Sequence, residues 1–129
     1  MITTSNLQVA SADSRDFVRH PLGGGLVSVR AVVSPSAYVG EFARVEGRAI
    51  VVGGSRLFDR AVVADEAIVT GMCTLRDDSR VDQHAVIRDG VFVYGHAHVS
   101  GTAHLAGNVR VGVRVKIAHG VFFGSLNIS

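Results

Sequence analysis

The sequence is poor in the residues that mark several common protein classes. Of its 129 residues only Cys73 is a cysteine, so no disulfide can form within the chain. It has no tryptophan and 6% aromatic residues, so its core would have to be built from Val, Ala, Leu and Ile. Lys116 is the single lysine, and the arginines are interspersed with acidic residues. A net charge of +2 without a basic run does not favour nucleic-acid binding.

Signals for targeting and for membrane insertion are also missing. The N-terminus, MITTSNLQVASADSRDF, lacks the basic start and apolar run of a signal peptide. No apolar stretch approaches the length of a transmembrane helix, about 20 residues. Hydrophobic residues nevertheless make up 47% of the chain, which argues against disorder. We therefore expect a single soluble domain with a hydrophobic core of modest size. The sequence resembles that of a bacterial protein, and a cytoplasmic location is the default expectation.

The sequence does contain a six-residue repeat, which begins in AVVSPSAYVGEFARVEGRA (residues 31–49). Hexads numbered from Ala31 continue to Leu126 without an insertion or deletion. Position 1 is always Ala, Ser, Cys or Val, and position 3 is always Val, Leu, Ile or Phe. Two hexad positions that keep the same kind of residue throughout the repeat predict a repetitive architecture.

The spacing within each hexad indicates a short strand followed by a corner. Positions 1 and 3 lie two residues apart, so they point to the same side of an extended chain, and position 2 points to the other. Position 5 is often Gly or Asp, which accept unusual backbone angles at low cost. Strands this short predict a coil whose successive turns pair in parallel. Three sides of six residues give a little over five coils.

The stretches AYVGEFARVEGRA and VFVYGHAHVSGTAHLAGNV resemble the hexapeptide-repeat family. The resemblance covers residues 31–126 and implies an all-β fold, a single-stranded left-handed parallel β-helix of triangular section. The left hand is implied by the resemblance alone, because β-α-β-type crossovers are usually right-handed. The stretch HPLGGGLV also resembles the lead-in of uncharacterised members rich in GxAxVxG.

The ends of the chain depart from the repeat. Residues 1–30 are predicted to form an N-terminal cap or lead-in, in which LQVAS and DFVRH are candidate strands, and residues 31–129 form the β-helix. Val27 already fits the frame as a position 3 residue. The apolar C-terminal VFFGSLNIS indicates either pairing with another chain or a longer repeat protein.

The outward residues at position 2 sort into three sides. The first side is almost wholly apolar, with Val52 and Thr70 extending it at position 4. An apolar stripe of this length is typical of an interface. Members of the family are commonly trimers, so we predict a homotrimer that packs through this side; cover by the N-terminal segment is the alternative. The predicted interface residues are Val32, Ile50, Ile68, Val86, His104 and Phe122.

The other two sides differ from the first. The second side mixes aromatic residues with arginine, a combination that is enriched at binding surfaces but also occurs as ordinary surface decoration. Its members are Tyr38, Phe58, Phe92, Tyr94, Arg56, Arg76 and Arg110. The third side has the composition of a solvated face.

The resemblance also implies an acyltransferase activity, in which a histidine acts as general base. The candidate base is His104, and His96 with Asp78 one coil below is a candidate oriented pair. A histidine at the edge of an interface and a surface charge ladder are the respective alternatives, and the sequence favours them. If the protein binds acyl-CoA, the phosphate groups of acyl-CoA would contact Arg110, Arg114 and Lys116. The chain departs from the family pattern because no loop interrupts the hexads.

Metal binding is a further alternative. His96 and His98 have a His-x-His spacing that could chelate, but the sequence indicates no third ligand. The fold also hosts zinc-dependent γ-carbonic anhydrases, whose histidine spacing is not reproduced here. Cys73 occupies an inward position and is predicted to be a buried small group rather than a nucleophile.

We therefore predict a rigid scaffold or assembly module without a clear catalytic constellation. An acyl-CoA-dependent acyltransferase and a γ-carbonic-anhydrase-like zinc protein are the alternatives. No cofactor or metal is expected, with acetyl-CoA as substrate only if the protein is an acyltransferase. A homo-oligomer is expected, with neither nucleic-acid nor membrane partners. The fold alone does not choose among these functions.

Overall fold

The computed structural model describes residues 16–129, and these residues form strands and turns without any helix. The first sheet contains β4 (Val32–Val33), β7 (Ile50–Val51), β10 (Ile68–Thr70), β13 (Val86–Arg88), β16 (His104–Ala106) and β19 (Val121–Phe123). The second contains β5 (Tyr38–Val39), β8 (Arg56–Leu57), β11 (Thr74–Leu75), β14 (Phe92–Val93), β17 (Val109–Val111) and β20 (Leu126–Ile128). The third contains β3 (Leu26–Ser28), β6 (Arg44–Val45), β9 (Val62–Val63), β12 (Arg80–Val81), β15 (His98–Val99) and β18 (Lys116–Ile117), with β2 (Phe17–Arg19) at its edge.

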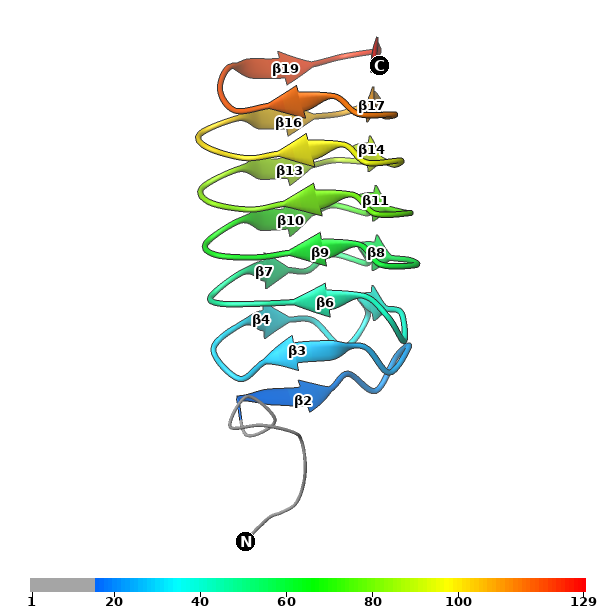
Figure 1. The fold of residues 1–129 in the computed structure, drawn as a ribbon, viewed down its shortest axis with the longest axis vertical. Coiled ribbons are helices and arrows are strands. Elements are labelled where there is room, and N and C mark those ends of the chain that lie inside the picture. Colours follow the sequence, from blue (N-terminus) through cyan, green and yellow to red (C-terminus); the bar gives the residue numbers. More distant parts are fainter. Residues whose placement is uncertain (1–15) are drawn as a thin grey trace, which may run out of the picture.

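These sheets are the three sides of a left-handed parallel β-helix, as predicted. In Figure 1 the near strands run to the left and the far strands to the right while the chain climbs toward its C-terminus. Neighbouring strands pair 18 residues apart, as in the pairing of Ile68 with Ile50 and with Val86. Each side carries six parallel strands, so the coil has about six turns rather than just over five. The additional turn arises because β3 pairs with β6 and so begins the coil before residue 31.

The interior is built from the two columns that the repeat predicts. Position 1 residues such as Ala43 and Ala61 are fully buried, and so are position 3 residues such as Val45, Val63 and Leu75. Small side chains suit position 1 because this position lies beside a corner, where the chain turns from one side of the narrow triangular cross-section to the next. The position 3 side chains fill the centre of the prism and form one continuous core. The inward columns are thus confirmed from residue 37 to residue 117.

The corners use the backbone conformation that position 5 predicts. Asp59 and Asp77 have φ of 56° and 60°, in the left-handed region, and Gly95 has 67°. The side chains of these corner residues also link successive turns. Asp59 Oδ2 accepts a hydrogen bond from the Asp77 N–H at 3.1 Å, and Asp77 Oδ2 accepts one from the Gly95 N–H at 2.8 Å. Aspartate at a corner therefore satisfies backbone donors of the next coil as well as adopting the strained angle.

The N-terminal end of the coil is covered by an antiparallel hairpin. β2 pairs with β3 through Phe17 and Ser28, and the intervening turn is held by a buried histidine. His20 Nε2 lies 2.8 Å from the carbonyl oxygen of Ala37 on the second side. The DFVRH strand is confirmed, whereas LQVAS lies outside the described residues.

The last coil differs from the predicted frame by one residue. His104 pairs with Val121 and Val109 pairs with Leu126, which are 17 residues apart. The shift occurs after Ile117, which still pairs with Val99 at a separation of 18. A one-residue shift turns every following side chain to the opposite face of its strand. The prediction of an uninterrupted frame to Leu126 was therefore wrong for residues 118–126.

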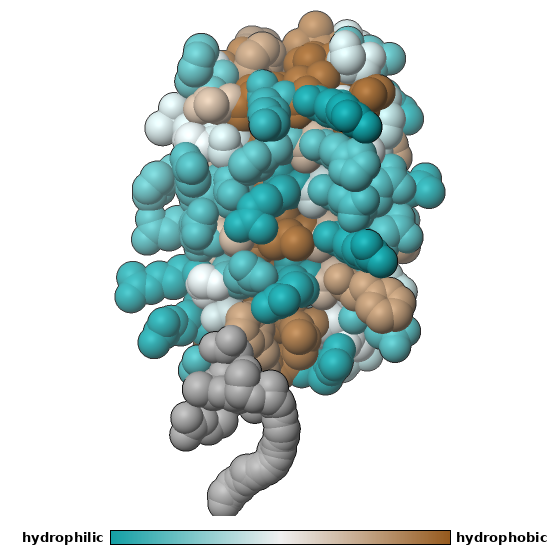
Figure 2. All heavy atoms as spheres, in the orientation of Figure 1, coloured by the Kyte–Doolittle hydropathy of each residue, from teal (hydrophilic) through white to brown (hydrophobic). Residues whose placement is uncertain are grey.

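The outer surface is unevenly polar. Figure 2 shows the face formed largely by the third sheet as mostly hydrophilic, with hydrophobic side chains at the C-terminal end, at mid-height and near the N-terminal end. Further apolar side chains are exposed in the last coil. The exposed apolar side chains there include Val121 and Phe123, which are 67% and 70% exposed. A search of residues 16–129 finds no helix with the length and apolar character needed to cross a membrane.

Candidate functional site

The first side presents a column of branched aliphatic side chains on its outer surface. Val32, Ile50, Ile68 and Val86 occupy equivalent places on β4, β7, β10 and β13 and are in register. Val32 is 56% exposed and the other three are partly exposed. The neighbouring outward residues on the same strands or just after them, Val52 and Thr70, are also uncharged. The strands β4, β7 and β10 therefore carry a flat surface without charge, whose height is about 10 Å at the usual strand spacing. β13 adds Val86 to this surface together with the exposed, charged Arg88.

His104 ends this column and is held by a neighbouring arginine. The Arg88 Nε–H donates a hydrogen bond to His104 Nε2 at 2.9 Å, and Arg88 Nη1 lies 2.7 Å from Asp89 Oδ2. Because a guanidinium can only donate, His104 Nε2 is the acceptor in this hydrogen bond. The nitrogen that would act as a general base is thus already engaged by Arg88.

Phe122, the last predicted interface residue, does not lie on this surface. The shift in the final coil makes it pair with Leu105 and turns it inward, where it packs against the core. Val121 and Phe123 face outward in its place. The first side therefore keeps an apolar outer surface at its C-terminal end, but through residues that the uninterrupted frame had placed inside.

The predicted His96–Asp78 pair is close but is not hydrogen bonded. His96 Nδ1 lies 3.8 Å from Asp78 Oδ2, and the two side chains are 63% and 46% exposed. His84 and Glu66 at another corner are nearer, at 3.2 Å, but are also largely exposed. Such solvated pairs contribute little to stability and do not fix the orientation of an imidazole.

The three residues predicted to bind phosphates do not share one face. Arg110 lies on β17 of the second side, where its guanidinium stacks 4.7 Å from the centre of the Phe92 ring. Lys116 lies on β18 of the third side, and Arg114 lies in the turn between these strands. Within the described part of the chain, no three His, Cys, Asp or Glu side chains are grouped closely enough to hold a metal ion.

A buried polar cluster on the third side was missed by the sequence analysis. The Asp82 side chain is 8% exposed, and its Oδ2 accepts a hydrogen bond from Arg80 Nε at 2.7 Å. Its Oδ1 lies 2.9 Å from His98 Nε2 on the next strand. The signal was available, because Arg80 and Asp82 lie two residues apart and His98 follows Arg80 by one turn of 18 residues. The third side is thus more ordered than a simple solvated face.

Cys73 is buried, as predicted from its inward position. Burial raises the pKa of the Cys73 thiol from 9.0 to about 11, although backbone hydrogen bonds partly oppose this increase. The thiol donates to the carbonyl oxygen of Thr70 at 3.1 Å. A protonated, buried thiol is a packing group and not a nucleophile.

Comparison with protein-family models, with curated proteins and with solved structures finds no match to this chain.

Proposed function

We propose that the protein is a structural assembly module that associates with copies of itself through the first side. The single observation that carries this proposal is the uncharged aliphatic column of Val32, Ile50, Ile68 and Val86 on the outside of a regular sheet. Apolar surface that faces water over several adjacent strands is a typical feature of protein interfaces.

A second copy of the chain is the partner that fits this surface best. Two such faces bring together mainly uncharged side chains, and Arg88 at the end of the column already has an acidic partner in Asp89, so contact desolvates few charged groups. The short strands and stacked corners also hold the column in a fixed flat arrangement, which lowers the entropic cost of association. The number of copies, three, rests on the resemblance to hexapeptide-repeat proteins.

The acyltransferase alternative would require His104 as its base. The hydrogen bond from Arg88 to His104 Nε2 weighs against that role, because the lone pair needed for proton abstraction is already occupied.

The experiment compares the mass in solution of the native chain with that of two matched variants. Ile68→Glu places a charge in the middle of the first side, and Val62→Glu places one at the equivalent position of the third side. Both native residues are partly buried, β-branched and at hexad position 2. Light scattering should give three times the chain mass of 13.6 kDa for the native protein and for Val62→Glu.

Ile68→Glu should give a smaller species with an unchanged β-rich circular dichroism spectrum. A monomeric native protein at micromolar concentration would contradict the proposal. Equal masses for Ile68→Glu and the native chain would show that association, if present, uses another face.

A further inference from the structure

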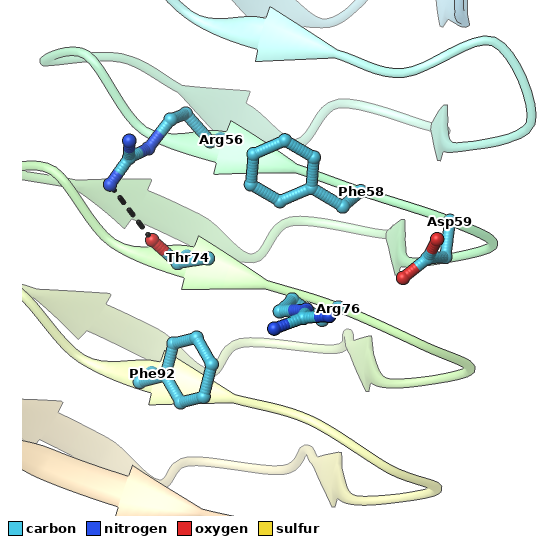
Figure 3. A pocket seen from close by; sticks show the side chains of 6 residues that line it. All are labelled: Arg56, Phe58, Asp59, Thr74, Arg76 and Phe92. Atoms are coloured by element: carbon cyan, nitrogen blue, oxygen red, sulfur yellow. Dashed lines mark hydrogen bonds between the residues drawn. The ribbon is translucent and has the colours of Figure 1, made fainter.

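The second side carries an open pocket of about 490 Å³ that spans three strands. It is lined by Arg56, Phe58, Asp59, Thr74, Arg76 and Phe92. Figure 3 shows the two phenylalanine rings on different strands with Thr74 between them and the arginine side chains alongside. Thr74 is the smallest outward residue of this column, so its position on β11 opens the space.

Each aromatic wall of this pocket is supported by a second ring. Tyr38 packs against Phe58, and Phe92 packs against Tyr94, with ring centres 5.3 Å apart in both pairs. Tyr94 in turn lies over Gly112, where any Cβ atom would meet its ring. The walls are therefore held in place by packing and do not depend on a ligand for their arrangement.

The two aromatic walls are offset along the sheet. Phe58 follows β8 and Phe92 lies on β14, and β11 separates these two strands. Two strand spacings amount to about 9–10 Å. Because Arg56 and not Phe58 is in register with Phe92, two residues along the strand add about 6–7 Å to this separation. A ligand ring therefore stacks on one wall and does not reach the other.

The arginines at the pocket have no acidic partners. Within residues 16–129, neither Arg56 nor Arg76 forms an ion pair. Arg110, which stacks on the Phe92 ring, forms none either. Arg56 Nη2 donates only a long hydrogen bond, of 3.4 Å, to Thr74 Oγ1. The carboxylate of Asp59 is directed to the corner, where it accepts from the Asp77 N–H. Free guanidinium groups beside stacked rings favour a planar ligand that carries a phosphate or a carboxylate.

From these contacts we propose that the pocket binds a small aromatic anion. The ring of the ligand stacks on Phe92 beside Thr74, and its anionic group is bound by Arg56 and Arg76. The volume is within the range of sites for small organic molecules, about 300–1,000 Å³.

Binding is tested by calorimetry with two series of probes. Adenosine 5′-monophosphate combines a ring and a phosphate, whereas adenosine lacks the charge and ribose 5-phosphate lacks the aromatic ring. Benzoate and benzamide provide the corresponding carboxylate arm. We expect measurable binding of the monophosphate, of benzoate, or of both, and at least about tenfold weaker binding of the probes that lack either feature. The arm that binds identifies which anionic group the arginines accept.

Two variants connect binding to the pocket, and a third provides the control. Arg76→Ala should weaken the binding of the probe at least about tenfold, and Phe92→Leu should weaken it while leaving the charge unchanged. Arg60→Ala removes an exposed corner arginine outside the pocket and should leave the affinity unaltered. Circular dichroism checks that all three variants remain folded.

Several outcomes would overturn the proposal. These are the absence of binding at millimolar probe, equal binding of adenosine and its monophosphate together with equal binding of benzamide and benzoate, or equal losses in Arg76→Ala and Arg60→Ala. Affinity for an oligonucleotide that increases steadily with its length would instead assign the face to a polymer. The oligomer measured with Ile68→Glu is independent of these results, because the two sites lie on different sides.

Discussion

The second and third sides of this prism have the same backbone but use their arginines in opposite ways. On the third side, Arg44 pairs with Glu46 at 3.0 Å and Arg80 pairs with Asp82 at 2.7 Å. Each acidic residue lies two residues after its arginine and directly follows the strand that carries the arginine. On the second side the residue two places after Arg56 is Phe58. The third side neutralises Arg44 and Arg80, whereas the second leaves guanidinium groups beside aromatic rings.

The difference shows that a repeat can separate structure from recognition. The inward residues are interchangeable between the two sides, since both are lined by fully buried aliphatic side chains. Only the outward residues at positions 2 and 4 differ, and they decide whether a face is internally satisfied or available to a ligand. Substitutions at equivalent places on the two sides should therefore have unequal consequences.

The largest difference is expected when equivalent arginines are replaced by methionine. Arg80→Met leaves the buried Asp82 carboxylate with His98 alone, and we expect a loss of about 1–3 kcal/mol in the free energy of unfolding. Arg56→Met removes only a long hydrogen bond and should change this free energy by less than about 0.5 kcal/mol. Urea denaturation of the two variants measures both. Equal losses would remove the distinction between a neutralised and an open face.

A smaller and opposite effect is expected at two inward serines. Ser79 on the third side is fully buried, and its hydroxyl has no hydrogen-bond partner among the described residues. Ser55 on the second side donates to the Val52 carbonyl oxygen at 3.0 Å and accepts from the Cys73 N–H at 3.2 Å. Ser79→Ala should therefore raise the free energy of unfolding by about 1 kcal/mol, and Ser55→Ala should lower it by about the same amount.

Denaturation curves for the two alanine variants check the signs. Position 1 is alanine in the neighbouring coils at Ala61 and Ala97, so alanine at residue 79 introduces no new shape. A destabilised Ser79→Ala would mean that its hydroxyl has a partner in solution.

A further effect, confined to high pH, concerns the pH dependence that Cys73 adds on the inside of the second side. Burial raises its pKa from 9.0 in the unfolded chain to about 11 in the folded protein, so folding favours the protonated thiol. The contribution to stability is complete below pH 9 and is lost as the pH increases from about 9 to 11. Comparing the native chain with Cys73→Ala over this range isolates the effect.

Labelling of the thiol provides a second measurement of the same property. At pH 8 a thiol reagent should modify the native protein very slowly and the protein in urea rapidly. Rapid labelling of the folded protein would show that Cys73 is accessible.

Much of the fold could be predicted from the sequence because the signal is local and repeated. A small residue at Ala43 and a branched one at Val45, two residues apart, must face the same way in an extended chain, and each later hexad repeats the constraint. The corners were predictable for the same reason, since Asp59 and Asp77 adopt the backbone angles expected for position 5.

The final coil was not predictable from the same pattern. Val121, Phe122 and Phe123 are all apolar, so either register places an apolar side chain inside. Only the pairing of β19 with β16 shows that Phe122 faces inward. The candidate sites were also only partly predictable. The aliphatic column follows from the 18-residue turn, but the burial of Asp82 and the hydrogen bond between Arg88 and His104 depend on how side chains extend across neighbouring strands.

The sequence by itself determined the short strands, their inward faces and the turns between them, because these depend on alternation and on backbone preferences within six residues. The tertiary structure decided the left hand of the coil, the one-residue shift near its C-terminal end and the outward groups that meet across strands. Those features depend on interactions between residues about 18 positions apart, which no single hexad contains.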